Sequence, residues 1–381
     1  METRKLYYED CHLSNFSAQV MSCEETDKGY AVTLNATAFY PEGGGQACDV
    51  GSLGGVTVLD VREKDGSIVH LCSQPLTVGE QVEGLVDWER RFDLMQQHTG
   101  EHILSGLIHK RFGWHNVGFH LGVSNVQIDF DGPIPTEALT ELELEANRVI
   151  WEDRPVLCSF PAEEVLPTIA YRSKKALDWP VRIVEIPGAD VCACCGTHLP
   201  TTGMVGCIKV ISAVKFHEGV RLEIVCGGRA LRYFSAVCEQ NRQVSQVFSA
   251  KMLETGAAAQ RANEALAAEK YRAAGLQNRL YDYIVKGYVN QKDIIHFEPG
   301  LDGAGVRTLA EKLCAVCDGY CAVFSEKEGG YSYCLATREG DLRQLCKDMN
   351  AALGGRGGGK PQFQQGTVSA TEDRIRTFFH K

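Results

Sequence analysis

The chain has 381 residues, of which 44% are hydrophobic and 23% are charged, and its formal net charge is −10. This length exceeds what one hydrophobic core usually fills, so we expect two or three domains, and the composition excludes a largely disordered chain. The acidic balance argues mildly against a nucleic-acid partner. Local basic clusters, such as Arg172, Lys174 and Lys175, favour a solvated face and also permit contact with RNA phosphates.

The chain shows no signs of export or membrane insertion. Its first residues contain no apolar run behind a basic stretch, and no segment approaches about 18 consecutive apolar residues. Sixteen cysteines without an export signal indicate reduced thiols, some of them metal ligands, rather than a disulfide framework. We therefore expect a cytoplasmic protein with no membrane partner.

We expect an α+β chain of four parts, of which the first is an all-β module and the second is an α+β domain. Residues 1–87 contain short alternating runs such as 56–61, separated by Gly and Asp, which predicts a small N-terminal β-barrel. Residues 88–228 begin with helical spacing of apolar residues behind Asp87, a candidate N-cap, and continue with a second helix over 135–151. Extended segments follow, so we expect helices packed on an antiparallel sheet.

The other two parts are a spacer and a C-terminal domain. Residues 229–285 lack proline and place apolar side chains at helical intervals, which predicts a long helical spacer with breaks at Gly256 and Gly275. Residues 286–381 mix strand and helix patterns and indicate a small α/β domain. We expect its glycine-rich stretch, 354–360, to be a loop.

Two histidine-containing motifs predict a metal site. His98 and His102 are four residues apart, which places both imidazoles on one face of a helix and close enough to share an ion. Cys194 and His198 repeat this spacing downstream and add a thiolate and a third imidazole. Zinc favours nitrogen and sulfur donors in a tetrahedral array, so these four residues predict a zinc site.

Other cysteines leave the choice of thiolate open. Cys192 and Cys195 form a C-x-x-C pair of their own, and we favour Cys194 for its spacing to His198. A further cysteine group falls on the apolar side of a predicted C-terminal helix, where we interpret it as part of the core rather than as a second metal site. Its members are Cys314, Cys317 and Cys321.

At these motifs the sequence resembles the alanyl-tRNA editing family, which comprises the editing domain of alanyl-tRNA synthetase and its free-standing relatives. The shared elements are the H-x-x-x-H motif, the C-x-x-x-H motif followed by Thr202 and Gly203, and the run 35–46. The run 354–361 resembles the final domain of the synthetase. The long free-standing type is most similar, and Cys195 departs from the glycine usual in the family. Because the synthetase catalytic domain is not part of the match, the resemblance implies editing without charging or ATP.

The resemblance also implies a reaction and several residue roles. The substrate is tRNA(Ala) wrongly charged with serine, or with glycine, and the reaction is hydrolysis of the ester. Thr37 matches a threonine that meets the serine hydroxyl, although from the residues alone it is only a strand residue. Gln46 is read as a substrate-binding residue or a turn cap, and Gly43, Gly44 and Gly45 as a turn that lets the backbone approach a ligand.

Three charged residues have two readings each. Glu101 lies inside the first motif and is a candidate general base. Its position beside His102 turns its side chain about 100° away on a helix, which favours a surface location. Arg356 and Lys360 flank the glycine stretch and offer contacts to an RNA backbone, while the same domain could instead form a homodimer.

Two other functions compete with editing. His98-x-x-Glu101-His102 is the string of inverted zinc metalloproteases, in which Glu101 is catalytic and a distant carboxylate completes the site. That reading leaves the cysteine and histidine motif unused. The second alternative is a tRNA-binding module with a purely structural zinc ion.

Overall fold

The computed structural model describes residues 2–173, 177–289 and 291–380, so Lys174 and Lys175 of the predicted basic cluster lie outside the described residues. Helices and sheets occur together in the chain, which confirms the predicted α+β class. Within the described residues, every helix is too short or too polar to span a membrane.

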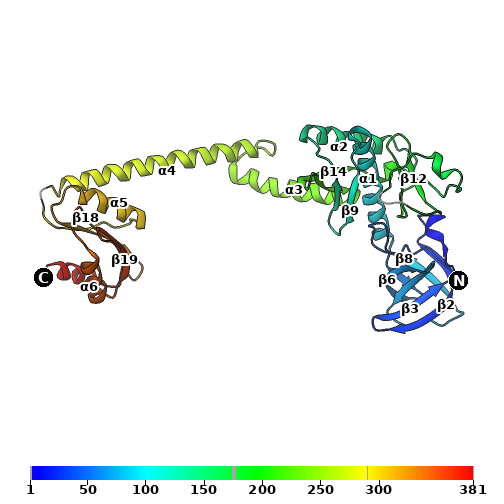
Figure 1. Ribbon diagram of the computed structural model, residues 1–381, viewed down its shortest axis with the longest axis horizontal. Coiled ribbons are helices and arrows are strands. Elements are labelled where there is room, and N and C mark those ends of the chain that lie inside the picture. The colour runs from blue at the N-terminus through cyan, green and yellow to red at the C-terminus, as the bar shows by residue number, and fades with distance from the viewer. Residues whose placement is uncertain (1, 174–176, 290, 381) are drawn as a thin grey trace. The chain divides into compact units, whose positions relative to one another are not determined.

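Two compact units make up the chain, Met1–Gln243 and Val244–Lys381 (Figure 1). The first unit contains the barrel, both motifs with histidines and most of helix α3 (Gly227–Phe248). The predicted boundary between barrel and second domain, near residue 87, is therefore internal to one unit.

The first unit begins with a closed β-barrel whose strands follow one another in the order β2-β3-β7-β6-β5-β8. Alternate side chains of these strands point inward to an apolar core that includes Val32, Val58 and Ile68. A short parallel pair, β1 (Arg4–Lys5) with β4 (Ala36–Thr37), lies outside the barrel order. The barrel strands are β2 Asn15–Thr26, β3 Gly29–Leu34, β5 Gly51–Leu53, β6 Val56–Lys64, β7 Ser67–Cys72 and β8 Gln81–Val86.

Helix α1 (Trp88–Phe112) follows the barrel directly and carries the first histidine motif. Asp87 caps it as predicted, because its side chain accepts a hydrogen bond from the backbone nitrogen of Arg90 at 3.1 Å. Gly113 ends the helix in the left-handed conformation, with φ of 78°. In Figure 1 the labelled barrel strands lie at one end of α1 and α2 (Thr136–Trp151) at the other.

A buried ion pair fastens α1 to the barrel. Arg91 and Asp49 are both 0% exposed, and Arg91 Nε donates to Asp49 Oδ1 at 2.8 Å. Arg91 Nη2 also donates to the carbonyl of Ala38 at 2.6 Å. Because buried charges are costly unless they are paired and hydrogen-bonded, this contact fixes the barrel against the helix that carries His98 and His102.

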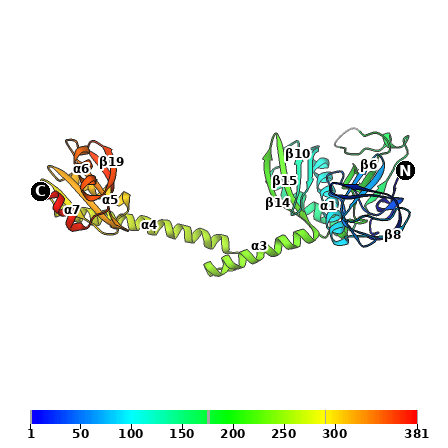
Figure 2. The ribbon, with the colours of Figure 1, turned by 90° about the horizontal axis from the view of Figure 1, so that it is seen from below.

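Two antiparallel sheets complete the surroundings of α1. One has the order β14-β15-β10-β9 and the other the order β11-β12-β13. Figure 2 shows β10, β14 and β15 beside α1. Leu104 of α1 shares an apolar core with Ile128, Leu142 and Leu222 from the sheet and α2. The strands are β9 Asn116–Leu121, β10 Val126–Phe130, β11 Leu157–Ser159, β12 Ile183–Ile186, β13 Asp190–Ala193, β14 Ile208–Phe216 and β15 Gly219–Cys226.

The predicted spacer consists of α3 and α4 (Thr255–Lys286). The expected breaks at Gly256 and Gly275 are wrong, because both glycines lie inside α4. A helical glycine costs only about 1 kcal/mol, which neighbouring good helix formers offset. The chain leaves the helix at Ser249 instead, where φ is 49°.

The second unit contains a sheet with the order β16-β17-β18-β20-β19. Alternation along β17 builds a core on each face: Val323 packs with α5, and Phe324 packs with α6 and α7. The cysteines of the predicted helix, 314, 317 and 321, are buried in the core on the α5 side. The elements are β16 Ile294–Phe297, α5 Gly303–Cys314, β17 Tyr320–Lys327, β18 Gly330–Thr337, α6 Arg343–Leu353, β19 Arg356–Lys360, β20 Phe363–Val368 and α7 Glu372–Phe379.

The glycine-rich stretch is mostly an edge strand, not the loop we expected. Strand β19 pairs with β20, and a Cβ on Gly357 would lie 2.3 Å from the carbonyl oxygen of Gln365 and 2.5 Å from Tyr333 Oη. The absence of side chains therefore lets this strand pack closely over its neighbours.

Candidate metal centre

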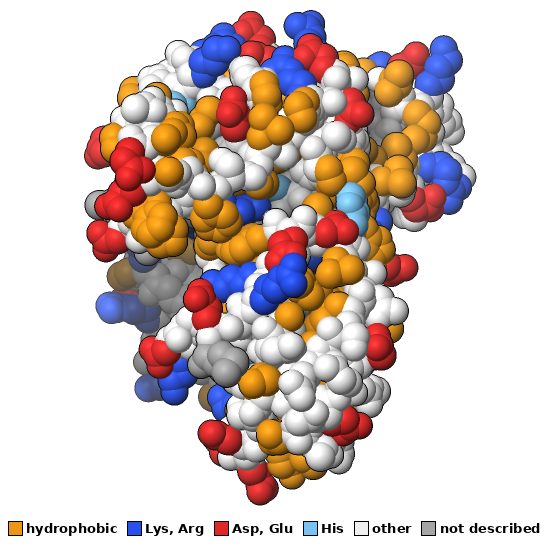
Figure 3. Space-filling view, turned by 90° about the vertical axis from the view of Figure 1, so that its right-hand side faces the viewer, with side chains coloured by type: hydrophobic (Ala, Val, Ile, Leu, Met, Phe, Trp, Pro, Cys, Tyr) orange, Lys and Arg blue, Asp and Glu red, His pale blue; other side chains and the backbone are white. Residues whose placement is uncertain are grey.

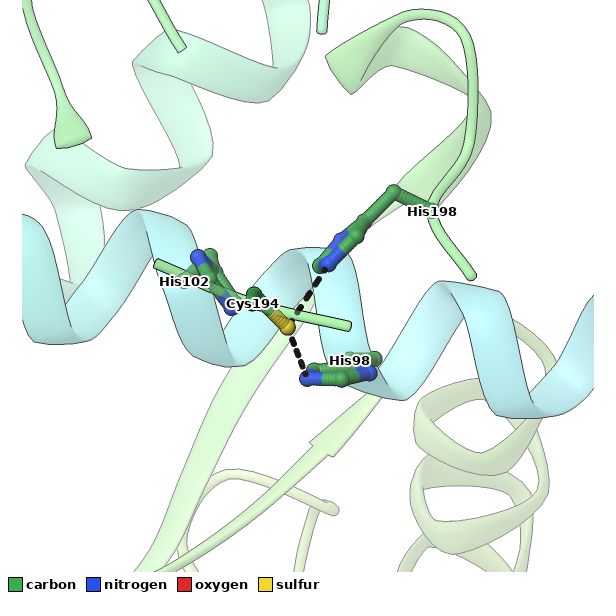
Figure 4. Close-up of side chains that lie close together, drawn as sticks. All are labelled: His98, His102, Cys194 and His198. Carbon is green, nitrogen blue, oxygen red and sulfur yellow. Dashed lines mark hydrogen bonds between the residues drawn. The ribbon is translucent and has the colours of Figure 1, made fainter. Parts of the chain in front are cut away.

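The four predicted ligands meet in the first unit (Figure 4). One donor atom from each of His98, His102, Cys194 and His198 lies within 4.8 Å of the others. Cys194 Sγ is 3.5 Å from His98 Nε2 and 3.4 Å from His198 Nε2. A tetrahedral zinc ion with ordinary Zn–S and Zn–N bonds would hold sulfur and nitrogen about 3.5 Å apart. The spacing of the donors therefore fits such an ion.

His98 is oriented by a barrel residue. Its Nδ1 lies 2.8 Å from Gln46 Oε1, an oxygen that can only accept, so Nδ1 carries the proton and Nε2 faces the other donors. Thr197 fixes the amide orientation of Gln46, because Gln46 Nε2 donates to Thr197 Oγ1 at 2.8 Å and Thr197 N donates to Gln46 Oε1 at 3.2 Å. Gln46 is thus a positioning residue for His98.

His102 is oriented by a carboxylate that the sequence did not reveal. Its Nδ1 donates to Asp190 Oδ2 at 2.9 Å, and Arg172 holds Asp190 through two bonds of 2.7 and 2.8 Å. Burial opposes protonation of His102, but the Cys194 thiolate and Asp190 together raise its pKa well above the usual value. The Asp190–His102 pair leaves Nε2 of His102 available to a metal.

His198 and Cys194 complete the donor set. His198 Nδ1 lies 3.3 Å from Thr99 Oγ1, and Thr99 is the residue after His98 on α1. Burial alone would raise the pKa of the Cys194 thiol, but the three histidines hold it well below its ordinary value. Gly196 N also donates to Cys194 Sγ at 3.3 Å. The thiolate, which is the metal-binding form, is therefore favoured.

A cavity of about 600 Å3 opens onto the cluster. His98, His102 and Cys194 line it, whereas His198 does not. Three further lining residues, Tyr8, Phe160 and Arg182, lie outside the two motifs. A metal ion at the cluster would thus be reachable from one side by a small organic group.

Glu101 lines this cavity, so the surface location favoured for it is wrong. It is 3% exposed, because α1 is packed on nearly all sides and a turn of 100° away from His102 still points inside. Ser105 Oγ donates to Glu101 Oε1 at 2.5 Å, and Asn116 Nδ2 donates to the same oxygen at 2.6 Å. The other oxygen, Oε2, lies 3.9 Å from His102 Nε2.

Thr37 is not brought to the cavity. It is 0% exposed in the barrel, where its hydroxyl donates to His70 Nε2 at 2.8 Å and accepts from the backbone nitrogen of Phe39 at 3.1 Å. His70 Nδ1 donates to the carbonyl of Val32 at 3.2 Å, which leaves Nε2 as the acceptor. The single hydroxyl proton of Thr37 is used by His70, and the residue does not line the cavity, so its contact with a substrate hydroxyl stays a prediction.

The first glycine run forms a tight turn. Gly43 and Gln46 bond to each other through both backbone groups, and Gly44 and Gly45 have φ of 59° and 85°. A Cβ on Gly45 would lie 2.5 Å from Phe119. Of the three glycines, only Gly44 lines the cavity, so the main effect of the turn is to deliver Gln46 to His98.

The remaining predicted residues lie apart from the donor cluster. Cys195 is exposed and its Sγ accepts from Tyr40 Oη at 3.7 Å, outside the group of four donors. Arg356 and Lys360 belong to the second unit, on the exposed strand β19, where both project from the same face because they are four residues apart.

Comparisons with known proteins fit this arrangement. A family model described as the threonyl and alanyl tRNA synthetase second additional domain matches residues 181–222, and one described as class II (A) tRNA synthetases matches residues 2–90. The alanyl-tRNA editing protein AlaX-L of Pyrococcus horikoshii is 28% identical over 97% of this chain and 96% of its own length. The predicted resemblance to the alanyl-tRNA editing proteins is confirmed.

Alanine–tRNA ligases are also similar to parts of the chain. The ligase of Pyrococcus abyssi is 32% identical over 96% of this chain, and that of Ignicoccus hospitalis is 36% identical over 65% of it. The chain spans only 42% and 28% of the lengths of these two ligases. The editing protein AlaX-L is thus the relative among these three that is matched end to end.

Several residues of the site were missed by sequence reasoning. Thr99 lies inside the H-x-x-x-H motif, so its position next to His98 could have indicated a role in the site. Asp190 and Asn116 had no such signal, because each meets its partner only in the folded chain. The basic cluster favours a solvated face that permits contact with phosphate, whereas the Arg172 side chain is only 12% exposed and is paired with Asp190.

Proposed function

We propose that this chain hydrolyses the ester bond of tRNA(Ala) mischarged with serine, and also with glycine. The observation that supports this most directly is the opening of three metal donors and one buried carboxylate onto a single cavity. Four protein ligands are typical of a structural zinc site, so zinc here would chiefly organise the site, while the cavity gives a substrate access to the buried carboxylate beside it. The end-to-end similarity to an alanyl-tRNA editing protein supplies the substrate class.

Zinc fits the donor set best. Three imidazoles and a thiolate are ligands that zinc prefers, and Gln46, Asp190 and Thr99 each lie at the Nδ1 atom of one imidazole, which leaves Nε2 for the metal. When bound there, zinc would hold the four side chains in place, and it would supply Lewis acidity toward an ester carbonyl or a water molecule on taking a fifth ligand or releasing one of the four.

Glu101 is the residue we assign to proton transfer. Ser105 and Asn116 hold one carboxylate oxygen, so the side chain is fixed in the cavity wall next to the donors. A carboxylate in this position can accept a proton from water as the oxygen attacks the ester carbonyl, and can return it to the departing ribose oxygen. The products are free serine and uncharged tRNA, and no other reactant is required.

The second unit is proposed to supply affinity for tRNA. Arg356 and Lys360 are exposed on one face of β19, with only glycines between them. In the full chain, replacing both by Ala should weaken tRNA binding and flatten its salt dependence, because fewer phosphate contacts release fewer counterions. The molecular mass should stay the same. Equal binding with a changed mass would favour the homodimer role instead.

The central experiment uses the purified full chain. Zinc content is measured first, followed by hydrolysis of Ser-tRNA(Ala), Gly-tRNA(Ala) and correctly charged Ala-tRNA(Ala), with a peptide substrate as control. We expect release of serine and glycine, little release of alanine, and no peptide cleavage. Zinc binding and tRNA binding without hydrolysis would overturn the proposal in favour of a non-catalytic module, and peptide cleavage would favour a protease.

A further inference from the structure

Phe160 and the loop that carries Cys194 both follow the same end of the β11-β12-β13 sheet. Phe160 follows β11, Arg182 precedes β12 and Cys194 follows β13, so the three residues continue the last paired row of the sheet. The pairs of that row are Ser159 with Ile183 and Ile183 with Ala193. Since neighbouring strands are about 4.8 Å apart, the backbone of Phe160 lies about 10 Å from that of Cys194.

Side-chain contacts hold the Phe160 ring relative to the metal loop. Arg182 Nη1 donates to the carbonyls of Cys194 at 3.0 Å and of Gly196 at 2.8 Å. The same guanidinium lies 4.7 Å from the centre of the Tyr8 ring. Tyr8 in turn packs edge to face with Phe160, with ring centres 5.5 Å apart. A continuous set of contacts thus runs from the Cys194 loop to Phe160.

Phe160 lines the cavity yet remains 52% exposed. Leu177 is a second apolar residue that lines the cavity and is substantially exposed. Figure 3 shows hydrophobic side chains bordering the hollow in the middle of this face of the molecule. An aromatic ring that is fixed on one side and open on the other is suited to receive a flat ligand.

We propose that Phe160 is the stacking platform for the 3′-terminal base of the aminoacyl-tRNA, and this proposal rests on the proposed function. The reacting ester is attached to the terminal ribose, so the base of the same nucleotide must lie about one nucleoside length from the metal. The sheet places the backbone of Phe160 at about that distance from the backbone of Cys194, and the Phe160 side chain lines the same cavity as the metal donors. Unpaired bases of single-stranded RNA stack on such rings.

We favour RNA over a protein as the ligand of this surface because Phe160 and the metal donors belong to one cavity. The ring and the metal donors line the same cavity, so whatever enters to meet the metal also meets Phe160. A peptide docked on the rim would gain nothing from the fixed distance to Cys194. If Phe160 stacks on the base, its substitution should weaken binding of substrates that contain a base and should not affect substrates that lack one.

The first test measures binding and does not require hydrolysis. The probe is a short single-stranded RNA that ends in CCA with a free 3′ hydroxyl, titrated against the full chain. Phe160→Ala should weaken binding about tenfold, whereas Phe160→Tyr should stay close to the unchanged chain because it keeps the aromatic face. Leu157→Ala is the matched control, since Leu157 is similarly exposed on the same sheet but does not line the cavity.

The second test compares two esters of serine, one with adenosine and one with ethanol. Phe160→Ala should raise KM for the adenosine ester about tenfold and leave the ethyl ester unchanged. Equal losses on both esters would show that Phe160 only shapes the cavity. Unchanged RNA binding in Phe160→Ala would contradict the stacking role. A protein would then be the favoured ligand of the surface around Phe160. If the unchanged chain hydrolyses neither seryl ester nor seryl-tRNA, the proposed function fails, and the RNA titration still decides the platform.

Discussion

Gln46 of the barrel turn accepts a hydrogen bond from Nδ1 of His98 on α1 at 2.8 Å. No described barrel residue belongs to the group of four donors, yet the barrel sets the tautomer and the direction of one of them. The buried Arg91–Asp49 pair fixes the same two parts against each other. The barrel and the donor cluster therefore act as one structural unit.

Removing the side chain of Gln46 should weaken the metal site. Gln46→Ala leaves the Nδ1 proton of His98 without its acceptor, and losses of this kind cost about 10- to 100-fold in metal affinity. Zinc affinity can be measured by competition with a chelating dye. Gln81→Ala, at an exposed barrel position, is the control and should bind zinc as the unchanged chain does. Equal affinity in both variants would contradict the positioning role.

Adjacent cysteines should respond differently to substitution. Cys194→Ala removes the thiolate from the donor group and should lower both zinc content and deacylation. Cys195→Ala should retain zinc, because Cys195 lies outside that group and is exposed. Metal analysis of both purified variants decides the matter. The reverse pattern would mean that the other thiol is the ligand.

Substitution of Glu101 tests its role as the base. Glu101→Gln keeps the acceptor for Ser105 and Asn116 but cannot take up a proton, so deacylation should fall by about 100-fold or more while zinc content is retained. Glu141→Gln, on the exposed face of α2, is the matched control. A loss of less than about tenfold, or about 1.4 kcal/mol, would remove Glu101 from the mechanism.

Thr37 should matter for stability more than for substrate choice. Thr37→Val leaves the buried Nε2 of His70 without a donor, which should cost about 1–3 kcal/mol. Urea unfolding followed by tryptophan fluorescence reports on the first unit alone, because all four tryptophans lie before residue 244. The ratio of serine to glycine release should be unchanged. An unchanged stability with reduced serine release would restore the role in substrate recognition.

Acid should destabilise the barrel through His70. Burial lowers the pKa of His70 to about 4 in the folded chain, against about 6.5 when unfolded. The unfolded chain therefore binds a proton more readily between these values, so stability falls as the pH drops from about 6.5 toward about 4. The loss should approach about 3 kcal/mol.

His70→Gln tests this prediction because it has no group that titrates in the window. Its urea stability should depend less on pH than that of the unchanged chain over the same range. His12→Gln, at an exposed position, should retain the original dependence. Identical pH profiles for all three proteins would mean that other groups dominate acid unfolding.

Local spacing in the sequence predicts the four candidate donors and the elements that carry them. His98 with His102, and Cys194 with His198, are each four residues apart, and this local spacing already brings their donors near each other. Asp87 as the N-cap of α1 is likewise a local signal that the structure confirms.

The surroundings of those donors come from packing between segments that are distant in the sequence. Helix geometry alone favours a surface position for Glu101, whereas packing on nearly all sides of α1 buries it against Asn116. Thr37 turned inward to a histidine 33 residues away. Gln46 meets His98, and Asp190 meets His102, across 52 and 88 residues of chain. Such pairings depend on sheet register and on how separate segments pack, and short-range spacing in the sequence predicts neither.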